Sequence, residues 1–231
     1  MFVPKNKTLE VAFLAVMTPF VTVLTYMFIF PIPETHGYFN FGEVGIYIAA
    51  ALFGPIVGAF AGGVGSMIAD IISGYIIYAP ATLIIKGTEG LIVGYLVRKL
   101  RTINVTQQQI ASGAGAVLLS GMVISVWYWT ILPLWIWIIY GLLIITLVIF
   151  SLMKIEREEL PLVISMVLGG MVMISGYFIY EQFYLGYPAI FELPFNIMQM
   201  VGGIIISIPV IKIVKFAITS MGISFEVIGE E

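Results

Sequence analysis

Several charged side chains fall inside long apolar stretches of this sequence. They are Glu43, Asp70, Lys86, Glu89 and Glu181. A charge inside a membrane helix costs about 3 kcal/mol on insertion scales, so such a side chain faces the protein interior or water. The chemistry open to these groups is ion pairing, proton transfer, or hydrogen bonding to a small polar solute.

Lys86 and Glu89 lie three residues apart, so the two side chains share one face of a helix. One interpretation is an intrahelical ion pair that lowers the cost of both charges. The other is that Lys86 points into a cavity and bonds an acceptor on a ligand, while Glu89 steadies it. We expect Asp70 to be a structural partner of another helix rather than a ligand contact. For Asn196 and Gln199, also three apart, we favour a place in the cavity wall over simple interhelical hydrogen bonding.

The elements that must position these residues are apolar segments. Hydrophobic residues make up 61% of the chain and charged residues 10%, whereas soluble domains carry about 25% charged residues. Runs of about 20 apolar residues, enough to cross a bilayer, recur along the sequence and are bounded by proline and glycine. We predict segments at 8–30, 42–53, 55–74, 79–97, 108–127, 132–152, 160–183 and 195–216. Segment 42–53 is too short to span comfortably and is expected to be tilted or buried.

Basic residues fall between alternate segments. The clusters are Lys5 with Lys7, Arg98 with Lys99 and Arg101, Lys154 with Arg157, and Lys212 with Lys215. With eight crossings all four clusters lie on one side, which the positive-inside rule identifies as the cytoplasm. We therefore predict eight spans with both termini cytoplasmic. The polar residues then lie near the outer ends of the segments, which indicates a cavity open to the outside.

The domain organisation follows from these segments. We predict an all-α, polytopic membrane helix bundle in which residues 1–231 form a single membrane domain. Residues 104–158 form an inserted transmembrane hairpin that contains all four tryptophans. Trp127 and Trp129 are expected either in a lipid-facing aromatic belt or, less favoured, stacked on a ligand.

The sequence also excludes several classes of function. It has no cysteine, no G-x-x-x-x-G-K-[ST] phosphate loop, no H-E-x-x-H motif and no G-x-S-x-G elbow. We expect no enzymatic activity, no cofactor and no metal site. No basic patch with interleaved aromatic residues is present, so nucleic acid is not an expected partner. The single histidine, His36, is expected to be solvated in a loop.

Small residues follow a four-residue spacing on two segments. They are Gly54, Gly58, Gly62 and Ser66 on one segment, and Gly90 and Gly94 on the next. Such stripes allow close helix approach. We expect these stripes to serve helix packing within this chain. The alternative is that they form a docking surface for another membrane protein.

Several stretches resemble one family in the order in which they occur. They are 37–43 (GYFNFGE), 50–70, 78–90 (YAPATLIIKGTEG), 176–181 (GYFIYE) and 192–202 (ELPFNIMQMVG). Together they resemble the S component of energy-coupling factor (ECF) vitamin transporters. The likeness is closest to the branch labelled riboflavin-type or hydroxymethylpyrimidine-type.

The resemblance implies a six-helix core, here 1–103 and 159–231, that captures a vitamin from outside with high affinity. It implies partners too: a transmembrane coupling (T) component, which docks on small residues of the first helix, here Ala12 and Ala15, and two cytosolic ATPases. The loop at 31–41 would close the site. The expected substrate-binding residues are Asn40, Tyr78, Lys86, Glu89, Tyr177, Glu181, Asn196 and Gln199.

The function we expect is the substrate-binding subunit of an ECF-type ABC importer in the cell membrane, surrounded by lipid. Candidate ligands are riboflavin, a hydroxymethylpyrimidine or thiamine-like compound, and a pyridoxine-like compound. The alternative is a stand-alone proton-coupled secondary transporter that uses Asp70, Lys86 and Glu89 as a proton relay. Such transporters usually show internal repeats and polar residues at the midplane, and the sequence shows no convincing repeat.

Overall fold

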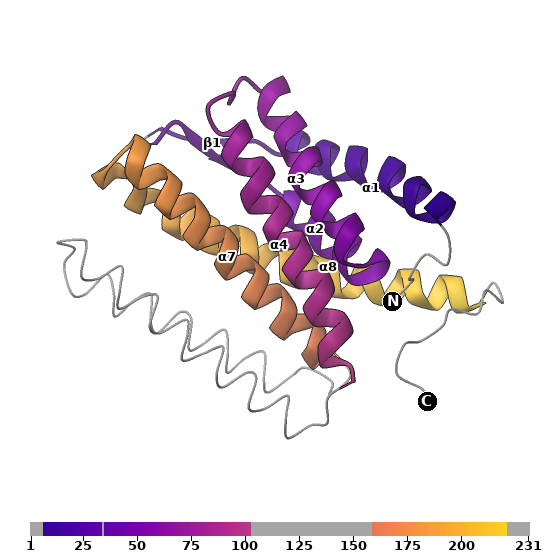
Figure 1. Ribbon diagram of the computed structural model, residues 1–231. Coiled ribbons are helices and arrows are strands. Elements are labelled where there is room, and N and C mark those ends of the chain that lie inside the picture. Colours follow the sequence, from indigo (N-terminus) through magenta and orange to yellow (C-terminus); the bar gives the residue numbers. More distant parts are fainter. Residues whose placement is uncertain (1–6, 34, 103–158, 221–231) are drawn as a thin grey trace.

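The computed structural model describes residues 7–33, 35–102 and 159–220, and these are mostly helical. Five helical stretches are long and apolar enough to cross a membrane. They are α1 (Lys7–Met27), α3 (Pro55–Ile72), α4 (Ala79–Leu100), α7 (Leu160–Tyr184) and α8 (Glu192–Ser220) with the short 3-10 helix η1 (Tyr187–Phe191) before it (Figure 1). The predicted bundle of long apolar helices is therefore confirmed for the described residues. The hairpin at 104–158 and both chain ends lie outside the described residues, so the count of eight spans stays a prediction.

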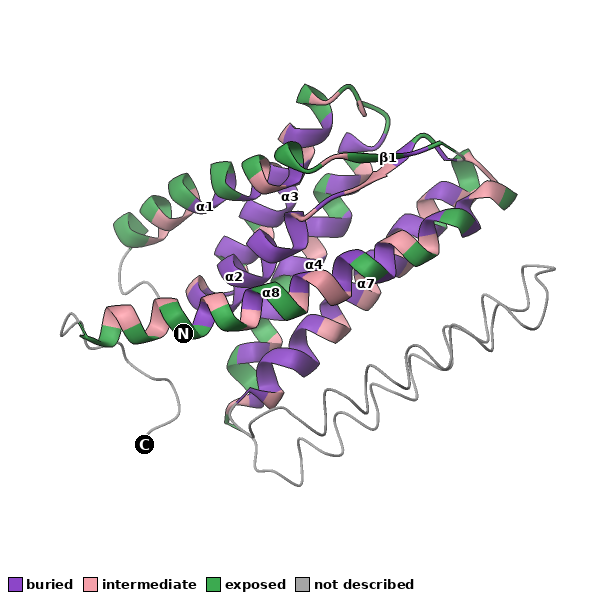
Figure 2. Ribbon diagram, turned by 180° about the vertical axis from the view of Figure 1, so that it is seen from behind, coloured by how far each residue is buried: buried purple, intermediate pink, exposed green. Residues whose placement is uncertain are grey.

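The short helix α2 (Gly42–Phe53) is the centre of the bundle. Its twelve residues span about 18 Å at 1.5 Å per residue, less than the roughly 30 Å of a hydrocarbon core. All residues from Gly42 to Leu52 are buried, because α1, α3, α4 and α8 pack around it. Figure 2 shows this central helix as buried and α1 as largely exposed. The buried placement expected for segment 42–53 is confirmed.

Helices α3 and α4 approach closely along their glycines. A Cβ added to Gly58 would lie 2.8 Å from the Gly90 carbonyl oxygen, and one added to Gly94 would lie 2.6 Å from Cα of Pro55. Both contacts involve backbone atoms, so neither position has room for a side chain. The predicted packing of the glycine stripe within this chain is confirmed, and it holds α4 in a fixed register against α3.

Helices α7 and α8 complete the bundle, with α7 against α4 and α8 against α2. Helix α8 begins at Glu192, three residues earlier than predicted. Pro194 lies within its first turn, where a missing N–H costs little because those donors have no intrahelical acceptor. At the other end of the bundle, Lys212 of α8 forms an ion pair with Glu159, the residue before α7.

The connection between α1 and α2 is a β-hairpin, which the all-α prediction missed. Strands β1 (Phe30–Ile32) and β2 (Gly37–Phe39) pair antiparallel, with Phe30 opposite Phe39. Helix α1 ends at Met27, so the predicted first segment was three residues too long. The hairpin lies near the end of α7 and the start of α8 (Figure 1), and β2 contacts α8. His36, in its turn, is exposed and has a φ of 56°.

Candidate binding site

A polar cavity lies at the hairpin end of the bundle. It contains about 420 Å³ of space free of protein atoms, a volume that includes adjoining open solvent. Helices α1, α3, α4, α7 and α8 and the hairpin all contribute to its wall. The wall consists of Thr25, Gly37, Tyr38, Asn40, Ser66, Asp70, Tyr78, Thr82, Lys86, Tyr177, Glu181, Glu192, Asn196 and Gln199.

The fold brings most of the sequence-predicted site residues to this one cavity. Asn40, Tyr78, Lys86, Tyr177, Glu181, Asn196 and Gln199 all line it. Glu89 does not form part of the wall and lies behind Lys86, fully buried. Ala12 and Ala15 lie elsewhere, exposed on α1, as a docking face would require. The ligand-binding and docking roles of these residues stay predictions.

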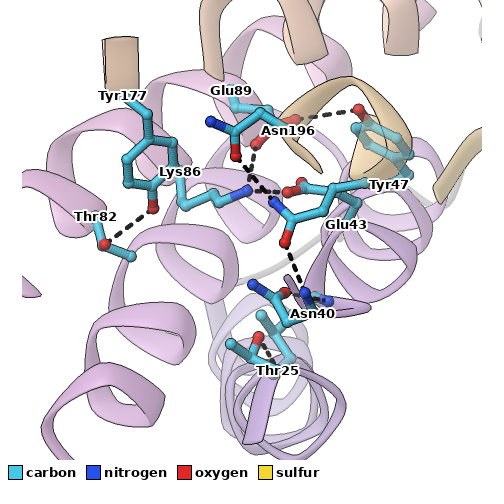
Figure 3. Close-up of polar contacts among 12 residues, drawn as sticks. Thr25, Asn40, Glu43, Tyr47, Thr82, Lys86, Glu89, Tyr177 and Asn196 are labelled. Atoms are coloured by element: carbon cyan, nitrogen blue, oxygen red, sulfur yellow. Dashed lines mark hydrogen bonds and ion pairs between the residues drawn. The ribbon is translucent and has the colours of Figure 1, made fainter. Parts of the chain in front are cut away.

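Lys86 is the centre of a buried charge cluster (Figure 3). Its Nζ donates to Oε1 of Glu43 on α2 and lies 3.5 Å from Oε2 of Glu89 on its own helix. The Tyr47 hydroxyl donates to the other oxygen of Glu89 at 3.1 Å. Nζ also lies 5.5 Å from the centroid of the Tyr177 ring, within the range of a cation–π contact. The intrahelical pair anticipated from spacing is present, but Lys86 is shared with a second carboxylate from another helix.

Amide side chains join the hairpin to α8. Oε1 of Gln199 accepts the backbone N–H of Asn40 at 2.7 Å, and Nε2 of Gln199 donates to Oδ1 of Asn196 at 3.4 Å. Oδ1 of Asn40 accepts the backbone N–H of Gly42 at 2.8 Å, at the start of α2. Asn40 and Gln199 are therefore occupied by protein contacts. Nδ2 of Asn196 has no hydrogen-bond partner in the described part of the chain.

Two carboxylates hold the hairpin over the cavity. The Tyr38 hydroxyl of β2 donates to Oδ1 of Asp70 on α3, and the Thr35 hydroxyl in the hairpin turn donates to Oε1 of Glu192 on α8. The Tyr78 hydroxyl donates to the Thr35 carbonyl at 3.3 Å. Burial, with the Asp70 carboxylate next to it, raises the pKa of Tyr38 far above 10.0, so this hydroxyl stays a donor near neutral pH.

Glu181 is the carboxylate on this wall with the fewest protein contacts. It lies in the last turn of α7 and is 2% exposed, and its Oε2 has no hydrogen-bond partner among the described residues. Burial raises the pKa of the Tyr78 hydroxyl, and the negative charges of Glu181 and Glu192 raise it further. An acceptor this deep and unsatisfied is costly unless something donates to it.

Aromatic rings form the remaining wall. Tyr177 shares a 2.9 Å hydrogen bond with Thr82 across α7 and α4. The Tyr38 and Tyr75 ring centroids lie 4.4 Å apart, and those of Tyr78 and Tyr180 lie 6.0 Å apart. Of these rings, Tyr38, Tyr78 and Tyr177 line the cavity, whereas Tyr75 and Tyr180 pack against Tyr38 and Tyr78 without forming part of the wall.

Some residues of the cavity wall were not predicted from the sequence. Glu192 lies between the predicted segments 160–183 and 195–216. A proline two residues later is typical of a helix's first turn, and Glu192 is the first residue of α8. A Cβ at Gly37 would overlap the Glu192 carboxylate, so a side chain there would displace that carboxylate. Tyr38 and Thr82 lay inside the stretches that carried the family likeness. No motif or spacing in the sequence indicated Thr25, near the end of α1, as a wall residue.

Comparison with known proteins decides the family. A family model described as "ECF-type riboflavin transporter, S component" matches residues 5–124, slightly more than half of the chain. The chain belongs to this family. The match includes α1 to α4 and the β-hairpin between α1 and α2, and therefore every element of the cavity wall of this ECF S component except α7 and α8.

Two curated relatives match parts of this S component. An "Uncharacterized protein in gap 3'region" from Pyrococcus woesei is 59% identical over 75 residues, which are 32% of this chain and 50% of that protein. The "Thiamine precursor transporter HmpT" of Lactococcus lactis subsp. cremoris (strain MG1363) is 36% identical over 91 residues, 38% of this chain and 55% of HmpT. The chain thus spans about half the length of the curated relatives that it matches.

Proposed function

We propose that this chain is the substrate-binding subunit of an ECF-type ABC importer, a multi-pass protein of the cell membrane that captures a small vitamin or vitamin precursor. Candidate ligands are riboflavin, a hydroxymethylpyrimidine or thiamine-like compound, and a pyridoxine-like compound. The observation that carries the proposal is the buried cavity at one end of the bundle, lined by polar side chains and closed by a hairpin. Membership of the S-component family and the partial match to a thiamine precursor transporter support it.

Binding follows from polar groups that the protein leaves without partners. Oε2 of Glu181 and Nδ2 of Asn196 are buried and unpaired within the described ranges. Leaving a buried donor or acceptor unsatisfied costs about 1–3 kcal/mol. A ligand that pairs both groups and packs its ring against Tyr177 removes that cost, which gives a small molecule high affinity for the site.

The proposed orientation rests on charge placement. Among the described residues, Lys7, Arg98, Lys99, Arg101 and Lys212 all lie at the end of the bundle opposite the cavity. Basic residues concentrate on the cytoplasmic side of membrane proteins. The cavity therefore faces outside, and the hairpin is the element that a ligand must pass.

Energy for uptake would come from partner subunits. The sequence has no phosphate loop of its own, so ATP hydrolysis belongs to two cytosolic ATPases that act through a T component. The exposed Ala12 and Ala15 on α1 provide a low-profile face for the T component, since small residues allow close helix contact.

The proposal is tested with the full chain purified in detergent. Calorimetry with riboflavin, hydroxymethylpyrimidine and pyridoxine should show one of them binding with high affinity and a one-to-one ratio. Vesicles that contain the chain, a T component and both ATPases should accumulate that vitamin only when ATP is supplied. Uptake by the chain alone, driven by a proton gradient, would instead establish the secondary transporter.

A further inference from the structure

The charged side chains in the wall of the cavity are mostly acidic. Asp70, Glu181 and Glu192 line it, and Lys86 is the one basic residue among the described residues of the wall. Asp70 and Glu192 each accept a hydrogen bond from a hydroxyl of the hairpin, and such bonds favour the ionised form of a carboxyl group. A ligand that enters this cavity therefore meets negative charge from α3 and from α8.

The ammonium of Lys86 is already paired within the protein. Its Nζ donates to Oε1 of Glu43 and lies 3.5 Å from Oε2 of Glu89 (Figure 3). The centroid of the Tyr177 ring lies 5.5 Å from the same nitrogen. Both carboxylates are fully buried, and neither forms part of the wall. When they are ionised, their two negative charges outweigh the one positive charge, so the cluster offers no net positive charge to a ligand.

Glu43 is the partner that reaches Lys86 from another helix. It lies in the first turn of α2, and α8 packs closely against it, since a Cβ added to Gly203 would lie 2.6 Å from Cβ of Glu43. Glu89 has a second partner, because the Tyr47 hydroxyl donates to it at 3.1 Å. Lys86 also lies closer to Glu43 than to Glu89. The pair with Glu43 therefore makes the larger contribution to neutralising Lys86.

We propose, building on the function proposed above, that Glu43 is a positioning residue that sets the charge specificity of the site. Because Glu43 holds Lys86, the cavity accepts a vitamin as the free alcohol and rejects the phosphate ester of the same vitamin. Each candidate ligand carries a primary alcohol, and a phosphate group on it carries about −1.5 to −2 charges near neutral pH. Against Asp70 and Glu192, and with Lys86 already paired, this buried charge has no partner, and like charges oppose association.

The same geometry predicts how the rejection would be relieved. Without the charge of Glu43, the Lys86 ammonium keeps only the longer contact with Glu89, and it can direct an N–H donor toward a phosphate in the cavity. Lysine is a common phosphate ligand in proteins. Because glutamine has nearly the shape of glutamate, Glu43→Gln changes the charge beside Lys86 with little change in packing.

The test uses calorimetry on the full chain in detergent. Riboflavin, pyridoxine and 4-amino-5-hydroxymethyl-2-methylpyrimidine are each compared with the monophosphate ester and the acetate ester of their primary alcohol. The acetate adds bulk without charge. For a vitamin that binds, the phosphate ester should bind at least about a hundredfold more weakly than the alcohol and at least about tenfold more weakly than the acetate. A phosphate ester that binds within tenfold of the alcohol, or as tightly as the acetate, overturns the inference.

Variants assign the rejection to one side chain. Glu43→Gln should raise the affinity for the phosphate ester relative to the alcohol at least about tenfold, whereas a general loosening of the fold would weaken all three compounds together. Glu159→Gln removes the carboxylate of another lysine–glutamate pair, at the opposite end of the bundle, and should leave the ratio unchanged. An unaltered ratio in folded Glu43→Gln contradicts the proposal.

A second substitution at the same position covers the case in which Glu43→Gln does not fold. Glu43→Asp shortens the side chain by one methylene and withdraws the carboxylate from Lys86, so the ratio of the two affinities should change in the same direction. A ratio equal to that of the unmodified chain would again contradict the role of Glu43.

The outcomes separate this inference from the function on which it rests. If one of the three alcohols binds tightly and its phosphate ester binds equally well or better, the inference fails while the vitamin-binding subunit stands. If the folded chain binds none of the alcohols and none of their esters, both fail.

Discussion

The Lys86 ammonium on α4 pairs with the Glu43 carboxylate on α2, a partner 43 residues away in the sequence. Both side chains are buried, at 3% and 0% exposure. The pair joins the central helix to the glycine-packed α3–α4 unit directly beneath the cavity. Lys86 therefore supports the fold as well as lining the site, and its substitution affects both.

We expect Lys86→Met to destabilise the protein by about 3–5 kcal/mol, because Glu43 and Glu89 would be left as buried charges without a cation. The double variant Lys86→Met with Glu43→Gln removes one of those charges and should recover part of the loss. Thermal unfolding in detergent measures both. A double variant no more stable than the single one would show that the pair does not govern this stability.

Asn196→Ala should weaken binding of the vitamin about tenfold with only a small loss of thermal stability, since Nδ2 has no protein partner in the described residues and the hydrogen bond lost at Oδ1, from Gln199, is long at 3.4 Å. Met198→Ala, two residues away on α8 and 58% exposed, is the control. Calorimetry should show the loss only for Asn196→Ala. Equal affinities would remove Asn196 from the ligand-binding residues.

Tyr38→Phe should loosen the hairpin. The phenyl ring keeps the contact with Tyr75, but Asp70 loses the hydroxyl that donates to it. We expect ligand dissociation to accelerate several-fold in stopped-flow measurements, while Tyr95→Phe, an exposed tyrosine on α4, leaves the rate unchanged. A dissociation rate in Tyr38→Phe equal to that of the unmodified chain would show that this contact does not hold the hairpin closed.

The contribution of Tyr38 to the free energy of unfolding should not vary with pH near neutrality. Burial and the Asp70 charge raise the pKa of Tyr38 above its unfolded value of 10.0. The stability it contributes is therefore fully present below pH 10 and is lost only as the pH rises above that value. The difference in stability between the unmodified chain and Tyr38→Phe should stay constant from about pH 7.5 to pH 9.

Gly90→Ala should cost about 1–3 kcal/mol of stability, because the new Cβ overlaps the Gly58 carbonyl and forces α3 and α4 apart. Gly202→Ala on α8 is the matched control. A Cβ there meets no atom within 4 Å, so the change should be neutral or slightly stabilising. Thermal unfolding of both variants measures this difference in stability. Equal melting temperatures would contradict the close packing of α3 and α4.

Tryptophan at Ala12 and Ala15 should abolish uptake without changing ligand affinity, since both positions are exposed on α1 and far from the cavity wall. Ile84→Trp, on an exposed face of α4, is the control for adding an indole to the membrane surface. Uptake in reconstituted vesicles and calorimetry report the two properties separately. Normal uptake by the double tryptophan variant would move the docking face elsewhere.

The sequence predicted what depends on local pattern and depth. Apolar length gave the helices, and the position of each polar residue within its segment placed Lys86, Glu181 and Asn196 at one end of the bundle. The sequence alone could not predict tertiary partners, because the pairing of Glu43 with Lys86 depends on how α2 packs against α4. The hairpin was missed because strands of three residues are too short for a period of two to be recognised.

The most direct test of the central claim is the affinity of the purified chain for its vitamin, measured by calorimetry before and after the double change Glu181→Gln with Asn196→Ala. We predict high-affinity, one-to-one binding by the unmodified chain, and loss of that binding in a variant that unfolds at the same temperature. Full affinity in the folded double variant would contradict the assignment of the cavity as the binding site.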